Sequence, residues 1–154
     1  MTRNNPYTTI AEKAGEYFFN GYHCAESVVA AACDVLPQID THKRETALTC
    51  STCFGGGFGK SFDEACGVIS GALIVLGLLY GRSKQGKSWD TPADLTALFR
   101  EAFLRKHKTT HCGQLRERFG DENQMIECQK LVCEGTAELL QLIKEHEEQK
   151  NGRR

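Results

Sequence analysis

The longest apolar run in the chain spans residues 65–80 and predicts a buried central helix. These sixteen residues carry no charge, and Ser70 is the only clearly polar side chain among them. A bilayer-spanning helix needs roughly 18 or more apolar residues, whereas a buried strand usually ends within about eight. A helix that is apolar on every side must be surrounded by protein. We therefore expect residues 65–80 to form the centre of the fold.

Other segments show apolar residues at helical spacing, separated by glycine, proline and polar turns. They are residues 7–19, 24–36, 41–48 and 91–108, a short piece after 109 and a last helix after 121. No segment alternates as a strand would. The pattern predicts an all-α fold in one domain over residues 1–154, with about five to six helices around the central one. We expect a helical core over about residues 7–144 and a charged tail, 145–154, that frays.

Length and charge narrow the class of protein. The 154 residues suit one domain, and 19 Lys and Arg stand against 20 Asp and Glu. Such a balance indicates neither nucleic-acid binding nor attachment to an anionic membrane. The N-terminal residues contain no continuous apolar stretch, and no run is long enough to span a membrane. We therefore expect a cytoplasmic protein without a signal peptide.

Eight cysteines are the strongest chemical signal in the chain. In a reducing cytosol they favour metal ligation or redox chemistry over structural disulfides. Cys24 and Cys66 fall at predicted helix starts, where the helix dipole favours a thiolate, and Cys112 heads a short helix. Cys128 lies on the inward face of the last helix. Helical phase turns Cys33 and Cys133 away from their neighbours Cys24 and Cys128.

Glycines mark two places where other groups can come close. The central helix has two glycines four residues apart, and a glycine-rich loop follows the C-x-x-C motif of Cys50 and Cys53. The loop matches neither a P-loop nor a dinucleotide fingerprint, and we expect it to bring Cys50 and Cys53 towards Cys66. The close-approach glycines are Gly55, Gly56, Gly57, Gly67 and Gly71.

Several stretches together resemble a known family. They are residues 22–28, 54–59, 66–73 and 77–81, then Cys112 and residues 128–132. Over about residues 11–143 the chain resembles the putative redox-active C-GCAxxG-C-C proteins. The resemblance implies a small soluble redox or metal-binding protein whose four matching cysteines act together: Cys24, Cys66, Cys112 and Cys128. The central motif reads CGVISG, a loose fit, and the other four cysteines are additional to the family pattern.

Our leading hypothesis is an iron–sulfur electron carrier with these four thiolates as ligands and an unknown redox protein as partner. A zinc site on the same ligands is an alternative, as is a dithiol oxidoreductase using Cys50 and Cys53. The fourth interpretation is a helical interaction module with ordinary buried thiols and no cofactor. His23 and His111 directly precede two of the cysteines, and we interpret them as solvated. Enzymatic turnover and homo-oligomer formation stay open at this point.

Overall fold

The computed structural model describes residues 7–153, which fold into seven α-helices and one short 3-10 helix. The helices are α1 (Thr8–Phe19), α2 (Cys24–Val35), α3 (Thr41–Ser51), η1 (Thr52–Phe54), α4 (Gly67–Tyr80), α5 (Asp90–His107), α6 (Cys112–Phe119) and α7 (Gln124–Gly152). The all-α prediction is confirmed. The predicted five to six helices are too few, because the short piece after residue 109 is a separate helix, α6.

The core is built on the crossing of α2 and α4. All of the residues from Ser27 to Cys33 in α2 are buried, and so are those from Gly67 to Ala72 in α4. A Cβ added to Gly71 would lie 2.7 Å from the carbonyl oxygen of Ala25, so the missing side chain lets the two backbones approach closely. The central position predicted for residues 65–80 is therefore shared with α2.

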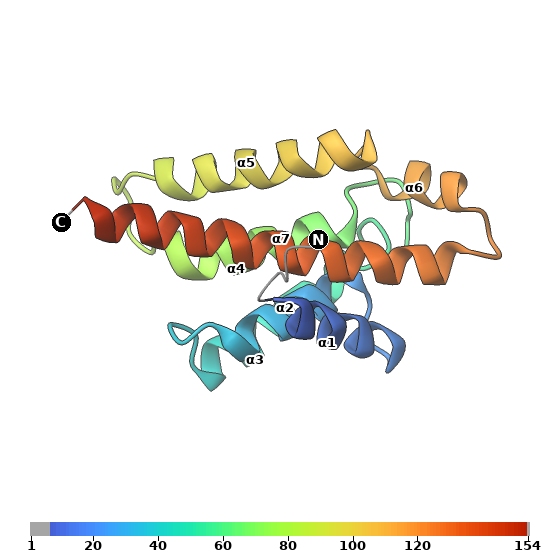
Figure 1. Cartoon of the computed structure of the whole chain (residues 1–154), viewed down its shortest axis with the longest axis horizontal. Helices are drawn as coiled ribbons and strands as arrows, with labels where there is room; N and C mark the ends of the chain where they lie inside the picture. The colour runs from blue at the N-terminus through green and yellow to red at the C-terminus, as the bar shows by residue number, and fades with distance from the viewer. Residues whose placement is uncertain (1–6, 154) are drawn as a thin grey trace, which may run out of the picture.

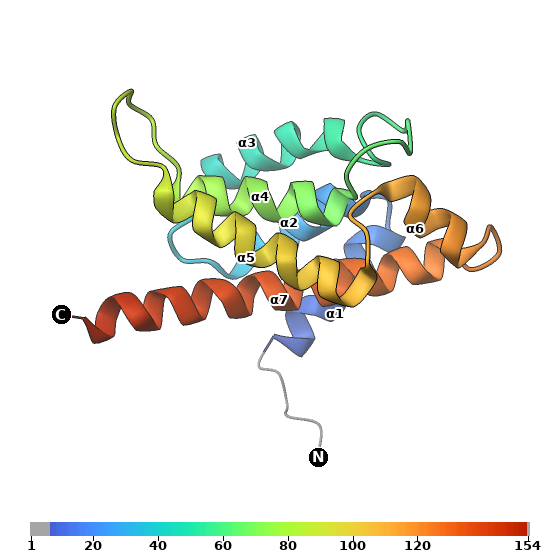
Figure 2. The same ribbon diagram turned by 90° about the horizontal axis from the view of Figure 1, so that it is seen from above.

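The other helices cover this pair. Helix α7 runs along the length of the molecule and packs against α1, α2 and α4 (Figure 1). Helix α5 lies beside α4 and α7, and the loop between α4 and α5 lies at the opposite end of the molecule from α6 (Figure 2). Helix α6 makes its main helix contact with α7. No helix in residues 7–153 combines the length and apolar character that a membrane span requires.

Two predicted boundaries need correction. Helix α4 begins at Gly67 rather than at residue 65, and its last turn is only half-buried, so it is not surrounded on every side. The tail expected to fray from residue 145 is helical to Gly152. The Tyr80 hydroxyl donates a 2.8 Å hydrogen bond to Glu147, and its ring contacts His146 edge-on. These contacts with α4 explain why the charged segment stays helical.

Candidate functional site

Four cysteines from four segments line one small cavity. Cys24 begins α2, Cys66 directly precedes α4, Cys112 begins α6 and Cys128 lies near the start of α7. The cavity has a volume of about 30 Å³, and its remaining walls are Val68, Leu115, Arg116 and Leu131. Helix α6 and the first turns of α7, which contribute lining residues, lie at one end of the molecule (Figure 1). The structure thus brings together the four cysteines that the sequence singled out.

Backbone pairing places Cys66 beside Cys112. The Cys66 N–H donates to the Thr110 carbonyl at 2.7 Å, and the Cys112 N–H donates to the Glu64 carbonyl at 2.8 Å. An antiparallel bridge between Ala65 and His111 lies between these bonds. The pairing joins segments far apart in the chain, which explains why helical periodicity could not predict it.

The glycine-rich loop closes over the cysteines. Its residues 56–60 all have φ between 59° and 64°, the left-handed region that favours glycine. A Cβ added to Gly57 would lie 2.7 Å from the Cβ of Cys112, and one added to Gly55 would lie 2.4 Å from the His23 ring. From the other side, a Cβ added to Gly67 would lie 2.2 Å from the Cys24 sulfur. The backbone therefore lies directly against two of the thiol residues.

Both histidines that precede a cysteine cap a helix. His23 Nδ1 accepts a 3.4 Å hydrogen bond from the Glu26 N–H, and Glu26 in turn accepts from the His23 N–H at 3.0 Å. His111 Nδ1 accepts from the Gln114 N–H at 3.3 Å. The interpretation of these side chains as simply solvated missed this role. The repeated His-Cys-x-Glu/Gln pattern was the available signal, because Glu or Gln three residues after an N-cap is typical of a capping box.

The four thiols differ in their electrostatics. Burial would raise the pKa of Cys24, but hydrogen bonds with the His23 side chain and the Gly56 N–H outweigh it and lower this pKa. Burial raises the pKa of the other three thiols, that of Cys112 to about 11. Of the four thiols, Cys24 is therefore the one that loses its proton most readily.

Arg116 brings an uncompensated positive charge to the cavity. Its Nε is buried and has no hydrogen-bond partner within residues 7–153, while its guanidinium lies 3.6 Å from the centroid of the Phe62 ring. Four thiols beside a cation with a free donor fit an anionic thiolate–metal centre. As the side chains stand, no three His, Cys, Asp or Glu residues between 7 and 153 are arranged to hold a metal ion. Binding a metal would require the thiols to turn towards it.

The other four cysteines lie away from the cavity. Cys50, at the end of α3, and Cys53, in η1, are exposed, so the loop does not bring them to Cys66. Cys33 is buried in the core, where burial raises its thiol pKa to about 11. The Cys133 sulfur faces α1, only 2.7 Å from where a Cβ on Gly15 would lie. Neither Cys33 nor Cys133 lines the cavity.

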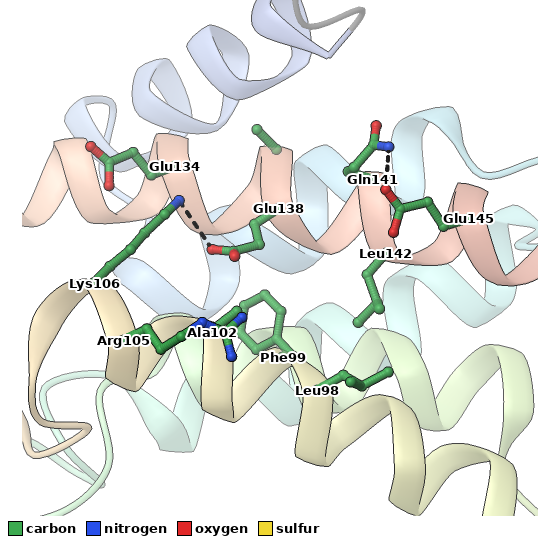
Figure 3. Close-up of a pocket in the computed structure, with 11 residues that line it drawn as sticks. Leu98, Phe99, Ala102, Arg105, Lys106, Glu134, Glu138, Gln141, Leu142 and Glu145 are labelled. Atoms are coloured by element: carbon green, nitrogen blue, oxygen red, sulfur yellow. Dashed lines mark hydrogen bonds and ion pairs between the residues drawn. The ribbon is translucent and has the colours of Figure 1, made fainter.

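A second hollow, of about 560 Å³, lies between α5 and α7 and contains no cysteine (Figure 3). It is lined by basic and acidic side chains, and two polar pairs lie within it. Lys106 Nζ lies 3.5 Å from a Glu138 oxygen, and Gln141 donates to Glu145 at 2.7 Å. None of the candidate residues reaches this groove, and we assign it no chemistry.

Comparison with known proteins identifies a family. The family described as "Putative redox-active protein (C_GCAxxG_C_C)" matches the chain over residues 22–150, which include all four cavity cysteines. No curated protein matches the chain, and no solved structure does.

Proposed function

We propose that the redox centre of this chain is built on the four cavity cysteines. The premise is that the chain belongs to the C_GCAxxG_C_C family of putative redox-active proteins. These are Cys24, Cys66, Cys112 and Cys128. The observation that carries the proposal is their convergence on one cavity from four separate segments. The centre would be an iron–sulfur cluster, and the protein would act in electron transfer with a redox partner.

The chemistry of the cavity supports a cluster. Four cysteine thiolates are the ligand set of [2Fe–2S] and [4Fe–4S] clusters, which supply one-electron exchange when bound. Val68, Leu115 and Leu131 give the cavity apolar walls, and a dry, apolar surround influences reduction potential. The His23 side chain and the Gly56 N–H, which lower the pKa of Cys24, would adjust this potential further, since hydrogen bonds to sulfur shift cluster potentials. Arg116 would offset the negative charge of the thiolates.

Purification without oxygen, followed by reconstitution with iron and sulfide, tests the proposal. We expect brown protein with broad visible absorption and matching amounts of iron and sulfide. Colourless protein that takes up zinc stoichiometrically would identify a zinc site on the same ligands, which suit tetrahedral zinc equally well. That result would overturn the iron–sulfur assignment.

Serine variants test the ligand set. Cys66→Ser should lose the cluster, because Cys66 lies on the cavity, whereas Cys33→Ser and Cys133→Ser should retain it. Loss of the cluster from either control, in protein that remains folded, would contradict the assignment of the four ligands.

Dithiol chemistry at Cys50 and Cys53 is the second candidate. Both thiols are exposed, and they are three residues apart where α3 continues into η1, a spacing that places side chains near one another on a helix. Replacing both with serine should leave the cluster intact. If the same double variant instead abolishes thiol–disulfide exchange with oxidised glutathione, and Cys112→Ser does not, the dithiol function is the correct one.

A further inference from the structure

A larger pocket lies in front of the four-cysteine cavity, and we call it the cysteine pocket. Its volume is about 650 Å³, within the range of small-molecule sites, and Cys24, Cys112 and Cys128 form part of its wall. It is bounded by the end of α1, the glycine-rich loop, α6 and the start of α7. A molecule bound there would contact the three cysteines from the open side.

The walls of the cysteine pocket are rich in aromatic and apolar side chains. Phe18, Phe19, Tyr22, Phe62 and Met125 contribute to it. Three of them are well exposed: Phe19 at 61%, Met125 at 53% and Phe62 at 37%. Clustered exposed apolar residues commonly mark a binding site, and rings and thioethers pack well on flat aromatic groups. These walls suit a ligand with an aromatic body.

The charges of the pocket all have one sign. Lys60 and Arg116 line it, and no Asp or Glu among residues 7–153 does. The Lys60 ammonium has no ion-pair partner within that range, and the buried Arg116 Nε has no acceptor there. The groove between α5 and α7 differs, because acidic residues line it as well and its Lys106 pairs with Glu138 (Figure 3). In the metal-free protein both cations lack a counter-charge, which indicates an anionic ligand group.

The loop fixes one of these cations in place. Lys60 is held in the left-handed region at φ 62°, and its N–H donates to the Gly55 carbonyl at 3.1 Å. Arg116 is held by its contact with the Phe62 ring. The fold therefore sets the position of the Lys60 backbone and of the Arg116 guanidinium, and the Lys60 side chain starts from the rim of the pocket.

We propose that the cysteine pocket binds a small aromatic anion, with its rings against Phe19 and Phe62 and its acidic group at Lys60 and Arg116. The site goes beyond the proposed redox centre and does not require a metal, since the pocket is formed by side chains and backbone of the chain alone.

Two fluorescent ligands of the same ring system test the site in the full-length protein. They are 1-anilinonaphthalene-8-sulfonate, an aromatic anion, and N-phenyl-1-naphthylamine, its uncharged counterpart. Lys60→Gln and Arg116→Gln should each weaken binding of the sulfonate about tenfold, because a hydrogen bond to a charged group contributes that much affinity. Binding of the uncharged amine should change less than about twofold, since it makes no such bond.

Control variants distinguish binding in the cysteine pocket from binding elsewhere on the protein. Arg105→Gln, in the groove between α5 and α7, should leave both ligands unaffected. Arg116→Lys keeps the charge and should retain more sulfonate affinity than Arg116→Gln. If Arg116→Gln fails to fold by near-ultraviolet circular dichroism, the exposed Lys60 decides the question.

Sulfonate binding that is unchanged in Lys60→Gln and in folded Arg116→Gln would overturn the proposal. So would equal weakening by Arg105→Gln, which would place the ligand in the other groove. The titrations are made on metal-free and on iron-loaded protein. If the cluster fails to assemble, the test of ligand binding still stands. If the ligand fails to bind, the test of cluster assembly still stands.

Discussion

Two glycines of α4 have opposite roles although both lie in the same apolar helix. A Cβ on Gly67 would lie 2.2 Å from the Cys24 sulfur, closer than any real contact. A Cβ on Gly77 would have no neighbour within 4 Å. Gly67 is therefore required by the site, whereas Gly77 only adds flexibility to the unfolded chain.

We predict that alanine at these positions has opposite effects on stability. Gly67→Ala should lower the free energy of unfolding by about 1–3 kcal/mol, the usual effect of overpacking, and impair cluster assembly. Gly77→Ala should raise it by about 0.5–1 kcal/mol, because alanine is the better helix former. Urea denaturation measures both. A Gly67→Ala protein with wild-type stability and a normal cluster would show that the backbone need not approach Cys24 this closely.

For individual residues, the sequence predicted the positions of the cysteines in the helices better than it predicted the groups around them. Helical periodicity located Cys24, Cys66 and Cys112 at helix starts, where the structure has them. It could not predict that the Cys24 thiol has a lowered pKa, since that depends on how the His23 side chain is oriented and on the N–H of Gly56 in a distant loop. Nor could it identify Arg116, whose significance comes from a missing partner in three dimensions.

Among the elements, the glycine-rich loop is the most unusual. Its left-handed residues include Phe58 and Lys60, for which this conformation costs roughly 1–2 kcal/mol each. Backbone hydrogen bonds hold it, among them one from the Gly59 N–H to the Cys53 carbonyl at 3.0 Å. The strained residues follow closely after Gly55 and Gly57, which lie against His23 and Cys112. Such a strained conformation persists when enough contacts with the surrounding structure hold it in place.

Glycine scanning should reveal this strain. Lys60→Gly and Glu64→Gly both replace an exposed side chain and make the unfolded chain equally more flexible, but only Lys60 has a positive φ. We expect Lys60→Gly to be more stable than Glu64→Gly by about 1 kcal/mol, measured by chemical denaturation. Equal stability of the two variants would mean that Lys60 is not strained in solution.

The sequence predicted the type of the elements well and their extent less well. The apolar period fixed the helices, and the absence of alternation excluded strands. It gave no information on the last turns of α7, which carry few apolar residues and are held by the contacts of Glu147 and His146 with Tyr80. The conformation of the glycine-rich loop could not be predicted either, because a glycine run is compatible with many backbone paths.

At the scale of the whole molecule, the proposed centre would join α2, α4, α6 and α7. Of these, α6 has only eight residues and depends mainly on α7 for helix contacts. A short helix with few packed neighbours opens easily. Metal bound through Cys112 would add a strong restraint at its first residue.

We therefore predict that iron loading slows amide hydrogen exchange in α6 more than elsewhere. It should also raise the melting temperature, because a ligand that binds only the folded state stabilises it. Amides of α5, which contributes no cysteine, serve as the internal reference. If loaded protein shows no added protection of α6, Cys112 is not a ligand.

The order of the four cysteines along the chain has a consequence for biosynthesis. A ribosome produces Cys24 first and Cys128 last, and Cys128 belongs to the final helix of the described chain. The cavity cannot form before the first turns of α7 are made, because Cys128 and Leu131 supply its last wall. Until then the earlier thiols have no completed site to enter, so a metal centre on these ligands would be inserted only after the first turns of α7 have been made, through the side that the cysteine pocket leaves open.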